Sequence, residues 1–411
     1  MPRPPALRQL KPLRLPEFRL LFLSTFGSSF GTLLAAIALA IDVKDRTNAG
    51  IWVGAVLVVE FVPMILVGLT LGPLIDRLER RKLMVGADLL RAAVFTALPF
   101  AGSASVIVAL ALVAGLANGF FSPAVYAGVP NLVPREELAD ANALLQTIEN
   151  ASWAIGPVLG GVLTAATSPH TAYWINAVSF LASAVLIARI PKQKLQSAVA
   201  LTRGHWTDLK EGFATVLRSR MLLAVLLGWG IAGLGVGSIS VSEVFLAKNT
   251  FQAGDFGYGL LFGGIGTGLV LGSFFSSVVT SRLGVPAAYG ISIAVMALGF
   301  GAGAASPNVW VAAACCVVGG AGDGVAIVCN ALLVQNGARD AVRGRALTVL
   351  MSGTRLVQAL STVLAGALMP AGGARWVWAA GAGSFAVAAL VGWALAREPA
   401  QTTAPAQIAT N

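Results

Sequence analysis

The chain has 411 residues, of which 56% are apolar and only 11% are charged, and 47 residues are glycine. A soluble protein carries roughly 25% charged residues, and the surface of so long a chain would have to be wetted. The composition therefore excludes an ordinary soluble enzyme, a disordered chain and a disulfide-built secreted domain. It predicts an all-α membrane protein that crosses the bilayer many times.

Apolar segments long enough to cross a bilayer recur along the whole chain. A transmembrane helix needs about 20 mostly apolar residues. Twelve segments meet this requirement: 18–41, 51–74, 83–101, 104–130, 138–166, 170–188, 220–246, 257–281, 285–305, 308–336, 343–369 and 374–396. The even number places both ends of the chain on one side of the membrane.

The net charge of +10 has two interpretations. A basic chain can bind nucleic acid, but positive charge also collects in the cytoplasmic loops of membrane proteins. With the N-terminus in the cytoplasm, 22 of the 28 Lys and Arg residues lie on that side, and only Lys44, Arg46, Lys248 and Arg375 lie on the other. We therefore expect both termini in the cytoplasm and no nucleic-acid partner.

The longest connection between spans divides the chain into two sets of six. The predicted parts are a cytoplasmic N-terminal segment (1–17), an N-terminal half (18–188), a cytoplasmic linker (189–219), a C-terminal half (220–397) and a disordered tail (398–411). In the linker, Trp206, Leu209, Phe213 and Val216 are spaced by 3, 4 and 3 residues. This spacing favours an amphipathic helix on the membrane surface over an unstructured linker.

A shift of 205 residues, half the chain, aligns landmarks of the two halves without a gap. Gly115 falls on Gly320, Gly119 on Gly324, Ala141 on Ala346, Gly161 on Gly366 and Arg77 on Arg282. Single matches between common residues are weak, but one constant offset brings three pairs of spans into register. Two parallel six-helix halves related by an axis along the membrane normal are typical of a secondary transporter with a site near the bilayer midplane.

The loop between the second and third spans carries a motif. Residues 72–82 read Gly-Pro-Leu-Ile-Asp-Arg-Leu-Glu-Arg-Arg-Lys. They resemble the G-x-x-x-D-R-x-G-R-R/K loop motif of the major facilitator superfamily, except that Glu79 stands where many members have Gly. The resemblance covers essentially the whole chain, and it implies the twelve-helix fold of that superfamily in two pseudo-symmetric halves.

The same resemblance implies a conformational latch. Asp76 ends a helix, where it can cap a neighbouring helix or pair with Arg, and the neighbour is then the start of span eleven. Such contacts hold the cytoplasmic ends of the two halves together and favour the outward-open state, although a basic cluster can also serve topology alone. The expected latch residues are Gly72, Asp76, Arg77, Arg80, Arg81, Arg343 and Arg345.

Span five contains a second motif, Gly156-Pro157-Val158-Leu159-Gly160-Gly161. It resembles the antiporter motif of drug-exporting members of the superfamily, although glycine-rich helices also occur in importers. Pro157 removes a helix hydrogen bond, and the glycines permit close helix packing. Shorter segments, such as residues 16–19 and 138–142, resemble the bacterial branch of the enterobactin exporter and the macrolide-efflux proteins, which implies the bacterial inner membrane.

Six charged residues fall well inside the predicted spans: Glu60, Asp88, Arg91, Glu149, Asp323 and Arg355. A charge at the bilayer centre costs about 2.5–3.5 kcal/mol, so these groups must pair, be neutral or face water. Asp88 and Arg91 lie three residues apart on one helix and are expected to form a structural pair. The other four fall near the midplane at a rise of about 1.5 Å per residue.

Burial favours the neutral form of a carboxyl group, so Glu149, Asp323 and, more weakly, Glu60 are candidates for coupling transport to protons. Arg355 would neutralise one of these acids or hold an anionic substrate. A fixed interhelical ion pair is the alternative in each case. Further residues that could contact an apolar substrate in the cavity are Asn118, Phe121, Tyr126, Phe26, Phe30 and Trp229.

The sequence lacks the spacings of metal, disulfide and phosphate sites. We therefore expect no enzyme, metal or cofactor, and a monomer whose partners are the bilayer, protons and a small-molecule substrate. The prediction is an exporter of a drug, siderophore or natural product that exchanges its substrate for protons by rocking alternating access. The alternatives are an uncoupled facilitator, a lysophospholipid flippase, and a transport-incompetent scaffold or sensor.

Overall fold

The computed structural model describes residues 10–196, 213–337 and 340–396. Within these ranges the side chains of residues 61, 64–65, 68–77, 220, 340–348, 370–372 and 395–396 are not described. Most of the predicted amphipathic linker helix, part of the predicted N-terminal segment and the predicted C-terminal tail lie outside the described residues.

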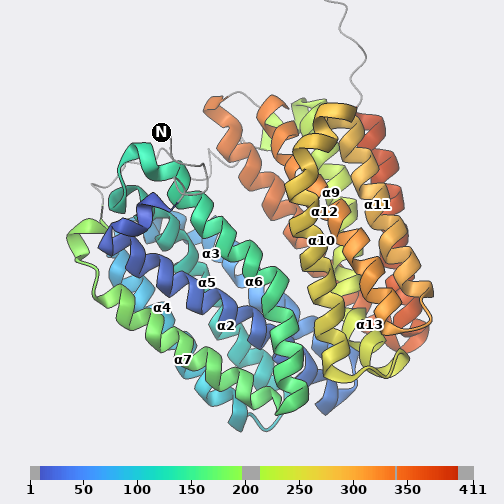
Figure 1. Ribbon diagram of the computed structural model, residues 1–411, viewed down its shortest axis with the longest axis horizontal. Coiled ribbons are helices and arrows are strands. Elements are labelled where there is room, and N and C mark those ends of the chain that lie inside the picture. Colours follow the sequence, from blue (N-terminus) through green and yellow to red (C-terminus); the bar gives the residue numbers. More distant parts are fainter. Residues whose placement is uncertain (1–9, 197–212, 338–339, 397–411) are drawn as a thin grey trace, which may run out of the picture.

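The described chain is helical almost throughout and contains no strand (Figure 1). The first group of helices is α2 (Pro16–Thr47), α3 (Gly50–Arg77), α4 (Arg80–Ala97), α5 (Ala104–Leu132), α6 (Leu138–Ala166) and α7 (Pro169–Ala188). The second is α9 (Arg220–Phe245), α10 (Gly254–Leu283), α11 (Val285–Ala305), α12 (Val309–Gly337) and α13 (Asp340–Ala396). Short turns are η1 (Lys11–Arg14), η2 (Leu98–Phe100), η3 (Arg135–Glu137), η4 (Lys192–Lys194) and the π-helical η5 (Leu246–Thr250).

Local sequence explains where several helices begin and end. Ser103 and Ser219 precede α5 and α9, and each hydroxyl oxygen accepts a hydrogen bond from the backbone N–H three residues later, which satisfies a donor that the first turn leaves free. Gly284 ends α10 with φ 76°. Gly373 has φ 69° inside α13. A left-handed φ is favourable for glycine, so α13 changes direction at Gly373 and contains two of the predicted spans.

The predicted all-α membrane fold is confirmed. Nine helical segments of the described part are long and apolar enough to cross a membrane, and each matches one of the predicted spans. The spans of α3, α6 and the part of α13 before Gly373 are helical but fall outside this set of nine. The count of twelve membrane crossings therefore stays a prediction.

The internal repeat appears in the helix bounds. Adding 205 to the bounds of α5, Ala104–Leu132, gives 309–337, which are the bounds of α12. The same shift takes α3 from 50–77 to 255–282, against 254–283 for α10. It takes α4 with η2 from 80–100 to 285–305, the bounds of α11. The two halves are therefore structural repeats of one another.

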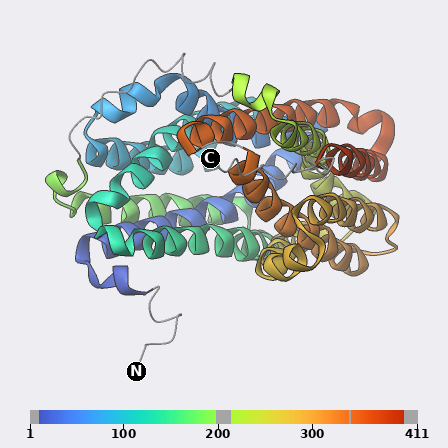
Figure 2. The same ribbon diagram turned by 90° about the horizontal axis from the view of Figure 1, so that it is seen from above.

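The helices of each half pack mainly with one another. Figure 1 shows α2–α7 on the left and α9–α13 on the right, and the view from above in Figure 2 keeps the two groups side by side. Within the N-terminal half, α2 packs on α6 and α7, and α4 packs on α5 and α7. Within the C-terminal half, α9 packs on α13, and α12 packs on α10 and α11.

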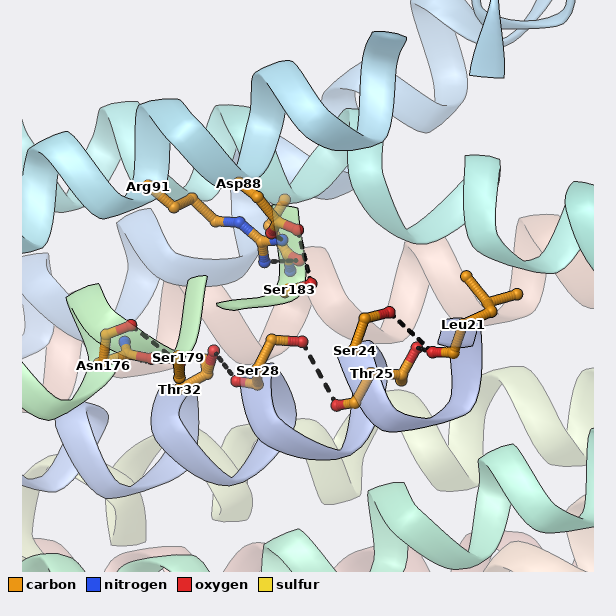
Figure 3. A network of polar contacts seen from close by, with 11 residues as sticks. Leu21, Ser24, Thr25, Ser28, Thr32, Asp88, Arg91, Asn176, Ser179 and Ser183 are labelled. Carbon is orange, nitrogen blue, oxygen red and sulfur yellow. Dashed lines mark hydrogen bonds and ion pairs between the residues drawn. The ribbon is translucent and has the colours of Figure 1, made fainter. Parts of the chain in front are cut away.

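A polar layer runs through the interior of the N-terminal half between α2, α4 and α7 (Figure 3). The predicted pair of Asp88 and Arg91 lies in this layer, and both side chains are buried. Ser183 of α7 donates a hydrogen bond to Asp88 Oδ2 at 2.6 Å. The Arg91 guanidinium lies 4.2 Å from the ring centre of Phe121 and 4.3 Å from that of Phe180. A buried ion pair with these contacts joins three helices.

Replacing Asp88 with Asn should lower the thermal stability of the protein in detergent. The variant leaves the buried Arg91 charge without its carboxylate, and breaking a buried pair on one side costs about 3–5 kcal/mol. The control is Glu17→Gln, because Glu17 pairs with the half-exposed Lys194 and a surface pair contributes about 0–1 kcal/mol. Equal melting temperatures for the two variants would contradict the structural role of Asp88.

Candidate functional site

The two halves are joined at one end of the molecule, which we call the joined end and define by residues 45–51 of the N-terminal half and 246–259 of the C-terminal half. Lys248 Nζ lies 2.7 Å from Asp45 Oδ2 of the other half and also pairs with Asp255. Asn249 donates a hydrogen bond to Asn48 across the same boundary at 3.4 Å. The Lys248–Asp45 ion pair and the Asn249–Asn48 hydrogen bond therefore connect the halves at this end.

Glycines let helices of the two halves approach closely near the joined end. A Cβ added to Gly161 of α6 would lie 2.8 Å from the carbonyl oxygen of Asp255 in α10, and one added to Gly366 of α13 would lie 2.5 Å from that of Gly50 in α3. Gly161 and Gly366 differ by 205 residues, as do Gly50 and Asp255. The contacts α6–α10 and α3–α13 are therefore repeat-related and form what we call the glycine seam.

The motif that resembles the antiporter motif belongs to this seam. A Cβ on Gly156 would lie 2.9 Å from Leu33 Cβ of α2, and one on Gly160 would lie 2.7 Å from the Leu34 carbonyl oxygen. Gly161 faces the other half, where a Cβ on it would lie 2.8 Å from Gly259 Cα. Pro157 is buried inside α6. The motif thus packs α6 against α2 on one side and against α10 on the other.

The predicted latch residues lie toward the opposite end. Arg80 donates hydrogen bonds to the carbonyl oxygens of Ala127 and Leu195, and Arg81 donates to those of Ala188 and Ile190. Ala127 and Ala188 belong to the N-terminal half, and Ile190 and Leu195 belong to the start of the predicted linker, so none of the four lies in the C-terminal half. The side chains of the other expected latch residues lie outside the description: Gly72, Asp76, Arg77, Arg343 and Arg345. The latch between the halves stays a prediction.

Glu149 in α6 is the best-connected acid among the midplane candidates. The hydroxyl of Tyr126 in α5 donates a hydrogen bond to Glu149 Oε1 at 2.5 Å, and Gln146 donates to Glu149 Oε2 and to Asn150 Oδ1. Glu149 is part-exposed, and Tyr126 is 39% exposed. The structure therefore brings two of the predicted residues together in an accessible carboxyl–phenol pair.

The C-terminal half brings together two further candidates. Asp323 of α12 interacts electrostatically with Arg355 of α13. Asp323 is part-exposed and Arg355 is exposed, and the Arg355 guanidinium donates to Gln358 Oε1 at 3.1 Å. The repeat offset places Arg355 opposite Asn150, so the two clusters occupy matching positions. Glu60 of α3 is part-exposed and lies closer to the joined end, within electrostatic range of Tyr258.

The aromatic candidates divide into exposed and buried groups. Phe26 is 46% exposed, and its ring packs 4.8 Å from that of Phe30. Phe121 is 5% exposed and lies against Arg91 inside the N-terminal half, where Asn118 accepts a hydrogen bond from the same guanidinium. We propose no substrate contact for Phe121 or Asn118. Trp229 of α9 is partly buried against the hydrophobic core.

Sequence reasoning missed several residues at the boundary of the halves. Trp153 of α6 is 45% exposed and stacks on Phe262 of α10, with ring centres 5.6 Å apart and an interplanar angle of 16°. The sequence places Lys248 on the side of the membrane with few basic residues but does not indicate its contact with the other half. Glu243 of α9 is 1% exposed, and its Oε1 has no hydrogen-bond partner. The sequence signal that could have pointed to Glu243 is its position inside a predicted span, three residues before the end of that span.

Two repeat-related halves joined at one end, with charged clusters on the helices that meet between them, define a transporter of the major facilitator type. The chain matches the family of transmembrane secretion effectors over residues 8–408. The chain therefore belongs to this family of the major facilitator superfamily.

Relatives and solved structures agree with this assignment. The chain is 27% identical to the multidrug efflux pump Tap of Mycobacterium tuberculosis over 87% of the chain and 88% of that protein. It is 26% identical to macrolide efflux protein A of Streptococcus pyogenes over 49% of the chain and 52% of the relative. An uncharacterized MFS-type transporter of Bacillus subtilis, YkuC, is 24% identical over 65% of both chains. The chain thus spans about half to two thirds of the length of the latter two relatives.

The fold is shared with solved transporters at low sequence identity. A bacterial homologue of the iron transporter ferroportin has a TM-score of 0.76 at 16% identity and covers 93% of this chain and 99% of its own. The nucleoside transporter NupG has a TM-score of 0.75 at 15% identity, with coverages of 93% and 100%.

Replacing Gly161 with Ala should shift the protein away from the joined state. The added methyl group would overlap the α10 backbone, and overpacking costs about 1–3 kcal/mol, which is roughly a fivefold to 150-fold change in a conformational equilibrium. Spin labels on Gly102→Cys and Ala305→Cys, which are both exposed, report the separation at this end by pulsed electron resonance distance measurement. The labels are introduced in a Cys315→Ala background, because Cys315 is only partly buried.

Gly383→Ala is the matched control, since a Cβ at Gly383 meets no atom within 4 Å. Gly366→Ala tests the repeat-related contact and should give the same shift as Gly161→Ala. A distance distribution for Gly161→Ala that equals those of the parent and of Gly383→Ala would contradict the assigned role of the seam.

Proposed function

We propose that the protein is a secondary active exporter of the bacterial inner membrane that exchanges a small amphipathic molecule for protons. The observation that carries the proposal is the Tyr126–Glu149 pair. It is an ionisable and partly exposed group on α6, a helix that also packs against the other half. A group that titrates on such a helix links proton binding to the relative position of the halves.

The charge distribution supports an orientation. Basic residues of the described chain gather at the end opposite the joined end: Arg14, Arg80, Arg81, Arg135, Arg189, Lys192, Lys194 and Arg218. Positive charge favours the cytoplasmic side. We therefore assign the joined end to the outside and the opposite end to the cytoplasm, and the conformation to the state that is closed toward the outside.

The outward direction of transport rests on similarity and on one motif. The relatives named as macrolide and multidrug efflux proteins act as exporters by their names, and residues 156–161 resemble the antiporter motif. Trp153, which stacks on the other half, and the exposed rings of Phe26 and Tyr126 offer apolar contact surfaces. Combined with the acids, they favour a substrate that has both an apolar body and a polar or cationic group.

The proposed cycle follows from the chemistry of these groups. Ionised Glu149 accepts the Tyr126 hydroxyl hydrogen bond and can attract a cationic group of the substrate. Protonation from the outside removes the charge and releases the substrate. Reopening toward the cytoplasm lets the proton leave to the less acidic side. Asp323 and Arg355 provide a second charge pair, and Arg355 can compensate Asp323 whenever that carboxylate is ionised.

The competing function is uncoupled facilitation, or flipping of a lysophospholipid, in the same fold. Both would use the exposed aromatic surfaces without the acids. Collapse of the pH gradient separates the possibilities, because it stops an antiporter and spares a facilitator. A scaffold or sensor would move no substrate under either condition.

Neutralising the acids should uncouple transport. In proteoliposomes with an imposed pH gradient, Glu149→Gln and Asp323→Asn should each lower gradient-driven uptake of a macrolide or a fluorescent lipophilic cation at least tenfold. Exchange of labelled for unlabelled substrate without a gradient should persist on the aromatic surfaces, with weaker affinity in Glu149→Gln because the carboxylate that attracts a cationic group is lost. Glu136→Gln, which changes an exposed acid in a turn, is the control. Intact gradient-driven transport in both Glu149→Gln and Asp323→Asn would overturn proton coupling at these sites.

A further inference from the structure

Glu243 near the end of α9 is buried with no charge partner. Its side chain is 1% exposed, and its Oε1 finds no hydrogen-bond donor. No ion pair between described residues includes it. An ionised carboxylate without a partner is strongly disfavoured in such surroundings, whereas a neutral carboxyl group is tolerated. The joined state therefore holds Glu243 in its protonated form.

Among the described side chains, the groups within electrostatic range of Glu243 include no cation that would compensate a negative charge. It interacts electrostatically with the phenol of Tyr258 in α10 and the thiol of Cys316 in α12, and both are buried. From α3, Glu60 acts on the same phenol. None of these groups is cationic, so none of them compensates a negative charge on Glu243.

The charged groups on the other elements that pack against α9 have partners of their own. Lys248 of η5 is shared by Asp45 of α2 and Asp255 of α10. Asp42 of α2 pairs with Arg46. In α13, Arg375 donates to the carbonyl oxygens of Ala304 and Ser306. Asp323 and Arg355 interact with each other.

Glu243 is close in sequence to residues that join the halves. Lys248 follows it by five residues, about 7 Å along a helix axis at 1.5 Å per residue. Val241, two residues before Glu243, is fully buried, and its Cγ2 would lie 3.6 Å from a Cβ at Gly54 of α3 in the other half. Separation of the halves here would move α9 and η5 away from α2 and α3 and bring water to this segment.

We infer that Glu243 is a proton-binding site that controls closure of the joined end: the protonated carboxyl group permits the joined state, and its ionisation favours separation of the halves. The sign follows from burial. Only the neutral form is accommodated in the joined state, whereas water can solvate the ionised form once the halves part. Acid therefore stabilises the joined state, and a rise in pH destabilises it.

This inference adds a second role for protons to the proposed function and rests on it only for the direction of transport. Protons reaching the carboxyl group from the outside would close that end behind a departing substrate. Glu149 and Asp323 would then bind protons at the substrate site, and Glu243 would bind a proton that controls closure of the joined end. The Asp45–Lys248–Asp255 cluster would add to closure independently of the protonation of Glu243.

The test measures conformation in the purified protein without transport. Spin labels on Gly102→Cys and Ala305→Cys, in the Cys315→Ala background, report the separation at the joined end from pH 5 to pH 9 in lipid nanodiscs. In the parent, the ratio of separated to joined populations should rise with pH, by up to about tenfold per pH unit for one linked proton. Glu243→Gln should stay joined, with a ratio that changes less than twofold over the whole range.

Glu243→Met provides a second neutral side chain of similar length in case the glutamine variant fails to fold, and it should also abolish the pH response. Lys248→Ala should raise the separated population at every pH while keeping the response. Glu136→Gln, which changes an exposed acid in a turn, should respond to pH as the parent does.

A pH response that survives in both Glu243→Gln and Glu243→Met would overturn the inference, as would a parent distribution that does not change with pH. Dependence of the ratio on sodium concentration at constant pH, abolished by the same variants, would identify a sodium site and also overturn it. Because no substrate is transported, failure here leaves the transport experiment unaffected.

Discussion

The close approach of helix backbones at the glycine seam is the constraint on which the arrangement of the halves depends. Gly161 against the Asp255 carbonyl and Gly366 against the Gly50 carbonyl leave no room for a side chain. Lipid gives little hydrophobic drive for helix association, so close packing of small residues must supply it. The two contacts are related by the same 205-residue shift that relates the helices. One packing solution is thus used twice, on either side of the pseudo-symmetry axis.

Polar groups inside the bundles serve different purposes according to whether they are paired. Asp88 and Arg91 pair with each other, and Ser183, Asn118 and two aromatic rings surround them, although Arg91 Nε has no hydrogen-bond partner. All of these contacts lie within the N-terminal half, so their energy does not depend on the position of the other half. Glu149 is held by a phenol but remains accessible. Glu243 is almost fully buried, and its Oε1 has no hydrogen-bond partner among the described residues. A fully paired charge stabilises one fold, whereas an incompletely paired charge has an energy that depends on conformation and protonation.

Much of the fold could be predicted from the sequence, because the bilayer imposes a simple rule on helix length and polarity. The predicted span 138–166 coincides with α6, and the constant offset reappears in the helix bounds. The Asp88–Arg91 pair follows from spacing on one helix. The predicted spans 343–369 and 374–396 are separated at the place where Gly373 interrupts the helical backbone of α13, so hydropathy also locates this change of direction. These features depend on local sequence or on periodicity.

The boundary between the halves depends on rotation of each helix about its axis, which hydropathy does not determine when a helix is apolar on every face. Phe121 was expected in the cavity but faces Arg91, while Trp153 on the next helix stacks on Phe262 of the other half. The partner of Lys248 lies 203 residues away, and no spacing rule connects them. Glu243 was overlooked because it is near a span end, where an acid is usually hydrated. Glu243 is nevertheless buried, within electrostatic range of Tyr258 in α10 and Cys316 in α12.

The joined end is held by two kinds of contact that can be broken independently of each other. The glycine seam contributes packing that does not change with pH, and the Lys248 cluster contributes exchangeable ion pairs, one of which involves the half-exposed Asp45. A two-state equilibrium moves from 1:99 to 99:1 with about 5.5 kcal/mol of differential binding. A surface ion pair contributes only about 0–1 kcal/mol, and one linked proton supplies at most about 1.4 kcal/mol per pH unit, so a gradient of one or two pH units falls short as well. Complete switching therefore requires the substrate site, the gate acid and the seam to act on the same rigid-body motion. This explains why the charged groups lie on helices that also carry the inter-half packing.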